Sequence, residues 1–182
     1  IGYPIFVAGT TKQNPVKFAK KIFRVAVFGF STSSSAAALP LNVKTTTEEL
    51  GVDEKIASFV LPLGMTINMN GTAIMQVVAT LFIAGCAGYD VTLSQIIVVA
   101  LLALIASAGT PAAPGAGAII LFTILSGLGY VNDGALLAYS LILAINRPIE
   151  MLVTALNVVG DSATAIYVAK SEGMLNEDIY NS

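Results

Sequence analysis

Six polar residues lie in the otherwise apolar stretch INRPIEMLVTALNVVGD. They are Asn146, Arg147, Glu150, Thr154, Asn157 and Asp161. All but Arg147 are spaced three or four positions apart, so a helix places them on one face. An ionisable group at the centre of a bilayer costs about 2.5–3.5 kcal/mol on insertion scales, and such groups normally face a protein interior or a solute pathway. The stretch therefore indicates a membrane helix whose polar face binds a solute or a cation, as in a membrane transporter.

The composition is typical of an integral membrane protein. Charged residues make up 11% of the chain and hydrophobic residues 55%, whereas soluble domains carry about 25% charged residues. No charged residue occurs between Ile56 and Tyr89 or between Val91 and Asn132, and each run exceeds the roughly 20 residues that cross a bilayer. We expect a multi-pass protein of the plasma (cytoplasmic or inner) membrane, in contact with lipid. The alternative is the apolar core of a large soluble enzyme.

The residue types disfavour several other functions. A net charge of −2 without a basic stripe gives no reason to expect a nucleic-acid partner. The chain has no histidine and no nucleophile–base pair, so we expect neither an enzyme nor a cofactor beyond a coupling ion. Cys86 is the only cysteine and cannot form a disulfide within the chain. The abrupt start, IGYPIFVAG, is typical of a fragment.

Hydropathy divides the chain into six segments. They are the end of a preceding transmembrane helix with its loop (1–14), a first re-entrant hairpin (15–52), a broken transmembrane helix (53–89), a second re-entrant hairpin (90–132), a last transmembrane helix (133–172) and a polar tail (173–182). Four basic residues between positions 17 and 24 give the first hairpin a rim that the positive-inside rule assigns to the cytoplasm. The second hairpin, without Lys or Arg, is expected to enter from the external face.

Both hairpins are too short to cross the membrane twice. The first runs from Lys21 to Glu48 through the serine-rich tip STSSSAAALP. The second begins with LSQIIVVALLALIA, about 21 Å of helix against an apolar core of about 30 Å. It then meets two Pro and three Gly in SAGTPAAPGAGA, at 107–118. Non-helical backbone at this depth has to be buried in protein or line a wet cavity.

The segment 53–89 carries helix-weakening residues at its centre. These are Pro62, Gly64, Asn68, Asn70 and Gly71. We expect a break there with freed backbone groups; the alternative is a proline kink packed against neighbours. Together the patterns predict an all-α membrane protein with two re-entrant helical hairpins and two interrupted transmembrane helices in an inverted-topology repeat. Substrate sites of secondary transporters lie at such repeat interfaces.

Four motifs carry a resemblance. SSSAAALP, NMNGTA, AGTPAAPGAGA and NVVGD, in this order and spacing, resemble the dicarboxylate/amino acid:cation symporters, the family of glutamate and neutral amino-acid transporters. The resemblance covers nearly all of the chain but only the C-terminal part of the family's transport domain. It implies an elevator mechanism, a homotrimer in the full-length protein and an extracellular gate formed by the second hairpin.

The resemblance also implies sodium sites. The first contains Gly64, Asn68, Asn157 and Asp161, and the second contains Thr66, Ser107, Ala108 and Thr110. Carboxylate, amide and carbonyl oxygens suit a hard cation such as Na⁺. Asn70 stands where the family signature NMDGT has a carboxylate that helps to bind a third sodium, which puts that site in doubt. Asn146 likewise replaces an aspartate of the archaeal homologue.

Ten residues are implied to contact the solute. They are Ser34, Ser35, Met69, Thr72, Ala113, Gly117, Glu150, Val153, Thr154 and Asn157. Amides at the hairpin tips suit the α-carboxylate of an amino acid, and Glu150, in place of the family's aspartate, suits its ammonium group. Val153 takes the position of the arginine that pairs with an acidic side chain in aspartate and glutamate carriers. Leaving a buried carboxylate unpaired costs about 2–5 kcal/mol, so we expect a small neutral amino acid.

Arg147 leaves one question open, because it either forms a local ion pair with Glu150 or replaces the missing cation from nearly two turns away. Three function classes remain. The first is a sodium-coupled symporter of small neutral amino acids. The second is a carrier of dicarboxylates or acidic amino acids with altered or proton coupling, and the third is a non-transporting homologue. The 182-residue chain alone is not expected to move solute.

Overall fold

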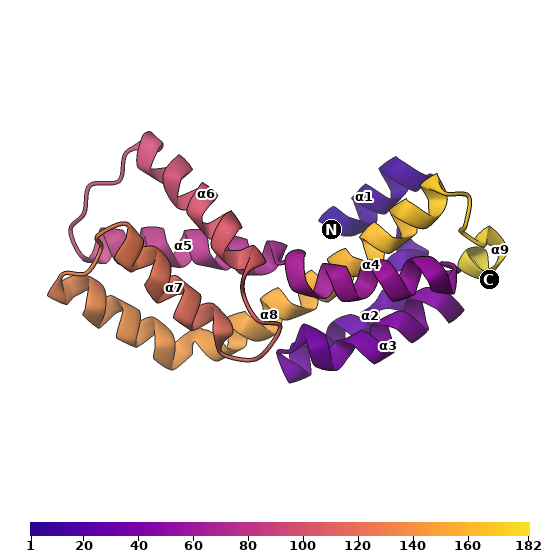
Figure 1. Cartoon of the computed structure of the whole chain (residues 1–182), viewed down its shortest axis with the longest axis horizontal. Helices are drawn as coiled ribbons and strands as arrows, with labels where there is room; N and C mark the ends of the chain where they lie inside the picture. Colours follow the sequence, from indigo (N-terminus) through magenta and orange to yellow (C-terminus); the bar gives the residue numbers. More distant parts are fainter.

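A computed structural model of residues 1–182 shows an all-helical chain (Figure 1). The helices are α1 (Gly2–Thr11), α2 (Pro15–Thr32), α3 (Ser35–Glu48), α4 (Glu54–Ile67), α5 (Asn70–Cys86), α6 (Leu93–Ala108), α7 (Ala116–Gly127), α8 (Asp133–Ser171) and α9 (Glu177–Asn181). The only extended pairing is an isolated antiparallel bridge between Val52 and Leu175. The prediction of an all-α protein is confirmed.

Helix α8 is shared by both ends of the molecule. Its 39 residues correspond to roughly 58 Å at 1.5 Å per residue. Helices α5 and α7 lie along its N-terminal half, with α6 packed on these two helices, and α1 to α4 with α9 surround its C-terminal half (Figure 1). Each end has its own apolar core. Helix α8 therefore holds the two ends relative to each other.

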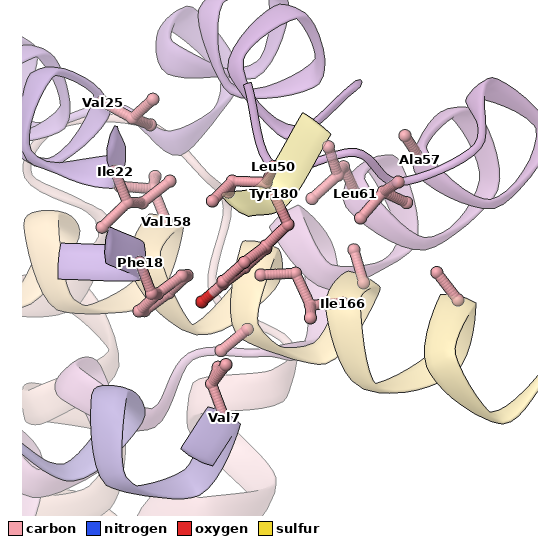
Figure 2. Close-up of a cluster of buried hydrophobic side chains, with 14 of the residues drawn as sticks. Val7, Phe18, Ile22, Val25, Leu50, Ala57, Leu61, Val158, Ile166 and Tyr180 are labelled. Carbon is pink, nitrogen blue, oxygen red and sulfur yellow. The ribbon is translucent and has the colours of Figure 1, made fainter. Parts of the chain in front are cut away.

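The larger core joins segments that are far apart in the sequence. Phe18 of α2, Leu61 of α4 and Ile166 of α8 are buried around Tyr180 of α9, which has no exposed surface (Figure 2). The smaller core lies between α5, α7 and α8, and consists of Ile83, Ala84, Leu121, Leu125, Tyr130, Ala135 and Ala138. Helix α6 contributes no residue to either core, but it packs against α5, with Val99, Ala103 and Ser107 buried.

The chain reverses sharply between α2 and α3. Asn14 caps the start of α2, with Pro15 in the first helical position. Helix α2 ends at Ser33, whose φ of +49° is left-handed. Helix α3 begins after Ser34, whose hydroxyl accepts a hydrogen bond from a first-turn N–H group. The serine-rich tip is therefore this two-residue reversal.

The predicted break in the segment 53–89 is present. Helix α4 ends at Ile67 and helix α5 begins at Asn70. Between them, Asn68 and Met69 have ψ angles of +73° and +44°, outside the helical region. The alternative of a continuous, proline-kinked helix is excluded.

The prediction of a second interrupted helix is wrong. Helix α8 is continuous, although Pro148 lies inside it. A proline removes one backbone donor and strains the preceding turn, but it does not by itself stabilise a non-helical backbone. The α4–α5 break has Asn68, Asn70 and Gly71 within four positions, whereas the residues around Pro148, such as Arg147 and Glu150, favour a helix.

Two stretches are long and apolar enough to cross a membrane. They are α4 together with α5, Glu54–Cys86, and α8. Helices α6 and α7 are apolar but shorter. Large apolar side chains are exposed on the outer faces of these helices, among them Ile74, Val78, Phe82, Leu101, Ile105, Leu137 and Leu141. Apolar surface of this extent suits contact with lipid or with further helices.

Candidate solute and cation site

Three irregular segments meet the polar face of α8 at one small cavity: the α2–α3 turn, the α4–α5 break and the α6–α7 loop. The lining consists of Ser33, Ser35, Met69, Thr72, Met75, Thr110, Pro111, Ala112, Ala113, Pro114, Gly117, Glu150, Val153, Thr154 and Asn157. Nine of the ten residues predicted from the sequence to contact a solute are in this lining. The tenth, Ser34, lies beside it.

The cavity is small. Its volume is about 30 Å³, enough for water but far below the roughly 300–1,000 Å³ of pockets that hold small molecules. The Ser34 hydroxyl donates to the Ala112 carbonyl at 2.9 Å, and the Ala36 N–H donates to the same oxygen at 3.5 Å. These bonds join the α2–α3 turn to the α6–α7 loop. The space between the two tips can enlarge only if these bonds break.

Three helices begin at the cavity. Helix α3 begins at Ser35, α5 begins directly after Met69, and α7 begins one residue before Gly117. The first turn of a helix has N–H groups without helical partners and a partial positive charge, so it attracts anions. No Lys or Arg lines the cavity. The arrangement therefore suits a carboxylate held by backbone amides.

Glu150 is the only ionisable residue in the lining and is 8% exposed. Its Oε2 accepts a hydrogen bond from the Gly115 N–H at 3.2 Å. Its Oε1 is buried without a partner. Since a buried carboxylate oxygen without a donor is costly, this oxygen is suited to accept a hydrogen bond from an ammonium group.

Arg147 forms an ion pair with Glu150, with Nη1 3.4 Å from Oε2. Its side chain is 53% exposed and does not line the cavity. The Glu150 side chain is only 10% exposed, so the pair joins a solvent-facing guanidinium group to a buried carboxylate. The structure therefore has the local ion pair, one of the two alternatives that the sequence left open.

Asn157 fastens the first turn of α5 to α8. Its Oδ1 accepts from the Gly71 N–H at 2.8 Å, and its Nδ2 donates to the Thr72 hydroxyl at 3.1 Å. The Thr154 hydroxyl, one turn away, donates to the Glu150 carbonyl at 2.8 Å. Asn157 is 2% exposed, so its amide connects the cavity to the group of polar residues behind it.

That group contains the residues of the first predicted sodium site. Asn68 Nδ2 donates to Asp161 Oδ1 at 2.8 Å and to the Asn157 carbonyl at 3.3 Å. Gly64 is so close to Asp161 that a Cβ there would lie 2.6 Å from Oδ1. One carboxylate, side-chain amides and backbone carbonyls from two helices converge, and these are oxygen donors that a hard cation accepts.

Asn70 extends this network to Tyr3, a residue not anticipated from the sequence. Asn70 Nδ2 donates to Asn68 Oδ1 at 2.7 Å and to the Tyr3 hydroxyl at 2.9 Å. A Cβ at Gly160 would lie 2.5 Å from that hydroxyl. Tyr3 is 67 positions from Asn70 on another helix, so no local pattern could have identified it.

The residues of the second predicted sodium site are only partly brought together. Ser107 and Ala108 line a separate cavity beside Met69 and Asn70. Thr110 lines the cavity beside Glu150 instead. Thr66 lines neither, and its exposed hydroxyl donates to the Leu63 carbonyl at 2.7 Å. The Ser107 hydroxyl is buried without a partner.

The sequence of residues 1–171 matches the model of one protein family, described as the sodium:dicarboxylate symporter family. An excitatory amino acid transporter of Caenorhabditis elegans is 37% identical over 166 residues, which are 91% of this chain and 32% of that protein. Excitatory amino acid transporter 2 of Homo sapiens is 37% identical over 172 residues, which are 93% of this chain and 29% of that protein. The chain spans about a third of the length of these relatives.

Proposed function

The chain belongs to the sodium:dicarboxylate symporter family, and from this premise we propose that it is the solute- and sodium-binding part of a sodium-coupled amino-acid symporter. In this proposal the full-length protein is a homotrimer in the plasma membrane, in contact with lipid. The chain alone, about a third of the relatives' length, does not transport.

One observation carries the proposal most strongly: a single buried carboxylate faces a cavity at which three helices begin. An amino acid carries an ammonium group and a carboxylate on neighbouring atoms. Glu150, with Oε1 unpartnered, suits the ammonium group, and the helix N-termini suit the carboxylate. Ser34, Ser35, Met69, Thr72, Ala113, Gly117, Val153, Thr154 and Asn157 complete the proposed solute site.

The membrane arrangement is part of the same proposal. Residues 15–52 and 90–132 form two re-entrant hairpins from opposite sides, within an inverted-topology repeat. The lengths of α6 and α7, 16 and 12 residues, give roughly 24 and 18 Å, short of the ~30 Å apolar core. Because a hydrogen bond joins the two hairpin tips at the cavity, the α6–α7 loop serves as the gate in an elevator mechanism.

Sodium coupling is proposed to use the group around Asp161. Its donors are Gly64, Asn68, Asn157 and Asp161, and Asn70 adds an amide at its edge. Thr66, Ser107, Ala108 and Thr110 are proposed as a second site that assembles when the gate moves. In the present structure, only Ser107 and Ala108 of these four residues share a cavity.

The solute's side chain separates two candidates. Val153 and the absence of Lys and Arg from the lining favour a small neutral amino acid. The names of the relatives, excitatory amino acid transporters, favour that class of solute instead, held by backbone amides at the helix N-termini. The neutral amino acid is our first candidate and the excitatory amino acid our second.

Uptake by the full-length protein in proteoliposomes tests this proposal. We expect a sodium gradient to drive uptake of alanine and serine in preference to aspartate and glutamate. Val153→Arg should then raise the affinity for the acids by about 30-fold or more, the equivalent of 2–5 kcal/mol for pairing a buried carboxylate. Val153→Met, similar in length but uncharged, is the matched control and should leave the preference unchanged.

The other outcomes are equally informative. A preference of the unaltered protein for aspartate and glutamate would establish the second candidate. Uptake driven by a proton gradient without sodium would indicate altered coupling. Neither binding nor uptake of any amino acid would mean a non-transporting homologue.

A further inference from the structure

Two side chains outside the cavity hold the first turn of α7. Gln76 of α5 donates from Nε2 to the Gly117 carbonyl at 2.7 Å. The Tyr139 hydroxyl of α8 donates to the Ala118 carbonyl at 3.0 Å. Consecutive carbonyls of α7 are thereby bonded to two different helices of the body.

The contact with Gln76 is close and specific. Gln76 is completely buried, and this is its only side-chain hydrogen bond. A Cβ at Gly117 would lie 2.8 Å from Met75 Cε, so a larger residue there would displace the end of the Met75 side chain. Neither donor was expected from the sequence, although Gln76 follows Thr72 by one helical turn and shares its face.

The remaining polar contacts of this region face the cavity. The Gly115 N–H donates to Glu150, and the Ala112 carbonyl accepts from Ser34 and Ala36. These bonds lie in the path of an entering solute. Gln76 and Tyr139 do not line the cavity, so their bonds can persist while it opens.

We propose that Gln76 and Tyr139 are positioning residues that hold the first turn of α7 while only the loop 109–115 opens. This inference rests on the proposed function, in which α7 amides receive the solute's carboxylate. With its first turn fixed, α7 presents these amides in the same place each time the loop closes. Without the two bonds, the amides are displaced and the closed state binds solute less tightly.

Removal of each donor in turn tests the proposal in the full-length protein. We expect Tyr139→Phe and Gln76→Met each to raise the KM for the transported amino acid by about 3- to 10-fold, the range of one net hydrogen bond. The maximal rate per inserted molecule should change by less than twofold. The double variant should have a higher KM than either single variant. Tyr167→Phe is the matched control, because Tyr167 lies on the same helix about 42 Å along its axis and should leave KM unchanged.

Hydrogen exchange distinguishes positioning from general destabilisation. In Tyr139→Phe, exchange should accelerate in the segment 115–121 and stay unchanged in 157–166, and solute should slow it less than in the unaltered protein. Equal exchange and equal KM in both proteins would overturn the inference. Acceleration in both segments, with a lower maximal rate, would mean a merely structural role and would also overturn it. If the unaltered protein itself takes up no amino acid, the proposed function fails first.

Discussion

At the scale of single residues, the group around Asp161 depends on two glycines. Gly64 lets α4 pack against the Asp161 carboxylate, and Gly160 lets α8 pack against Tyr3 and Asn68. Both helices thereby place their polar side chains within hydrogen-bond distance. The polar residues of this group are easily recognised in the sequence, but the close approach of their helices depends on the two glycines.

Gly160→Ala tests this close packing. The new Cβ would lie 2.5 Å from the Tyr3 hydroxyl and 2.7 Å from Asn68 Nδ2, so one of them has to move. We expect a loss of about 1–3 kcal/mol in stability, typical of overpacking, and a weaker sodium dependence of solute binding. Gly85→Ala is the control, because nothing lies within 4 Å of a Cβ there. Equal melting temperatures and sodium dependence for the two variants would contradict the argument.

The site was predictable from sequence where its residues share one helix. Glu150, Thr154 and Asn157 follow helical spacing, and the structure places all three at the cavity. Tyr3 and Tyr139 could not be found in this way, because their roles come from contacts between helices. Thr66 lies away from the other residues of the second predicted sodium site for the same reason, because its distance from them depends on how α4 packs against α6.

At the scale of elements, the α6–α7 loop is rich in proline and glycine, and one of its glycines has a backbone conformation that other residues rarely adopt. It contains two Pro and three Gly between 107 and 118, and α7 begins after Gly115, whose φ of +83° is left-handed. That conformation directs the Gly115 N–H to Glu150. A glycine at this position is therefore required by backbone geometry, with no neighbour to clash with.

Gly115→Ala should strain the loop. A left-handed non-glycine residue costs about 1–2 kcal/mol, so we expect a lower melting temperature and a solute affinity reduced by about 5- to 30-fold. Gly109→Ala, in the same loop at φ −94°, provides the control and should be tolerated. Thermal unfolding and solute titration of both variants decide the matter. A loop that accepts alanine equally well at both positions would show that the bond to Glu150 does not depend on this conformation.

The helices themselves were largely predictable, and the exception is instructive. Asn68, Asn70 and Gly71 together predict the break between α4 and α5, which is present. The second expected interruption is absent, because α8 is continuous and accommodates Pro148. A proline weakens a helix locally, but α8 continues through it and packs into one core near each of its ends.

At the scale of the whole molecule, the C-terminal tail is bound to the base of the first hairpin. Lys21 Nζ donates to the carbonyls of Glu49, Ile179 and Tyr180 at 2.8–2.9 Å. The Tyr180 hydroxyl donates to the Asn14 carbonyl at 3.0 Å. The sequence predicted only a polar tail here, because an isolated tyrosine in a charged segment gives no sign that it fills a core.

Alkaline pH should release this tail. Burial raises the pKa of Tyr180 from its ordinary value of 10.0 to about 12. The folded state favours the protonated hydroxyl, so its contribution to stability is complete below pH 10 and is lost as the pH rises towards 12. We expect the melting temperature of the solubilised protein to fall across this interval.

Tyr180→Phe is the control for that fall. It keeps the ring and loses one hydrogen bond, which costs about 1 kcal/mol at neutral pH. Lys21, whose Nζ lies 5.8 Å from the Tyr180 ring, is present in both proteins, so any effect of its titration is common to them. The melting temperature of Tyr180→Phe should therefore fall less steeply above pH 10. Identical slopes would show that ionisation of Tyr180 does not cause the fall.

The buried position of Tyr180 also bears on the order in which the protein is made. Helix α2 leaves the ribosome long before α9, since Lys21 and Ile179 are 158 positions apart. Until α9 is synthesised, Phe18 and Ile22 have an unfilled apolar space beside them, and contacts between such distant residues are slow to form. The α2–α3 pair is therefore synthesised before its base is complete, and its base closes only when the tail of the chain arrives.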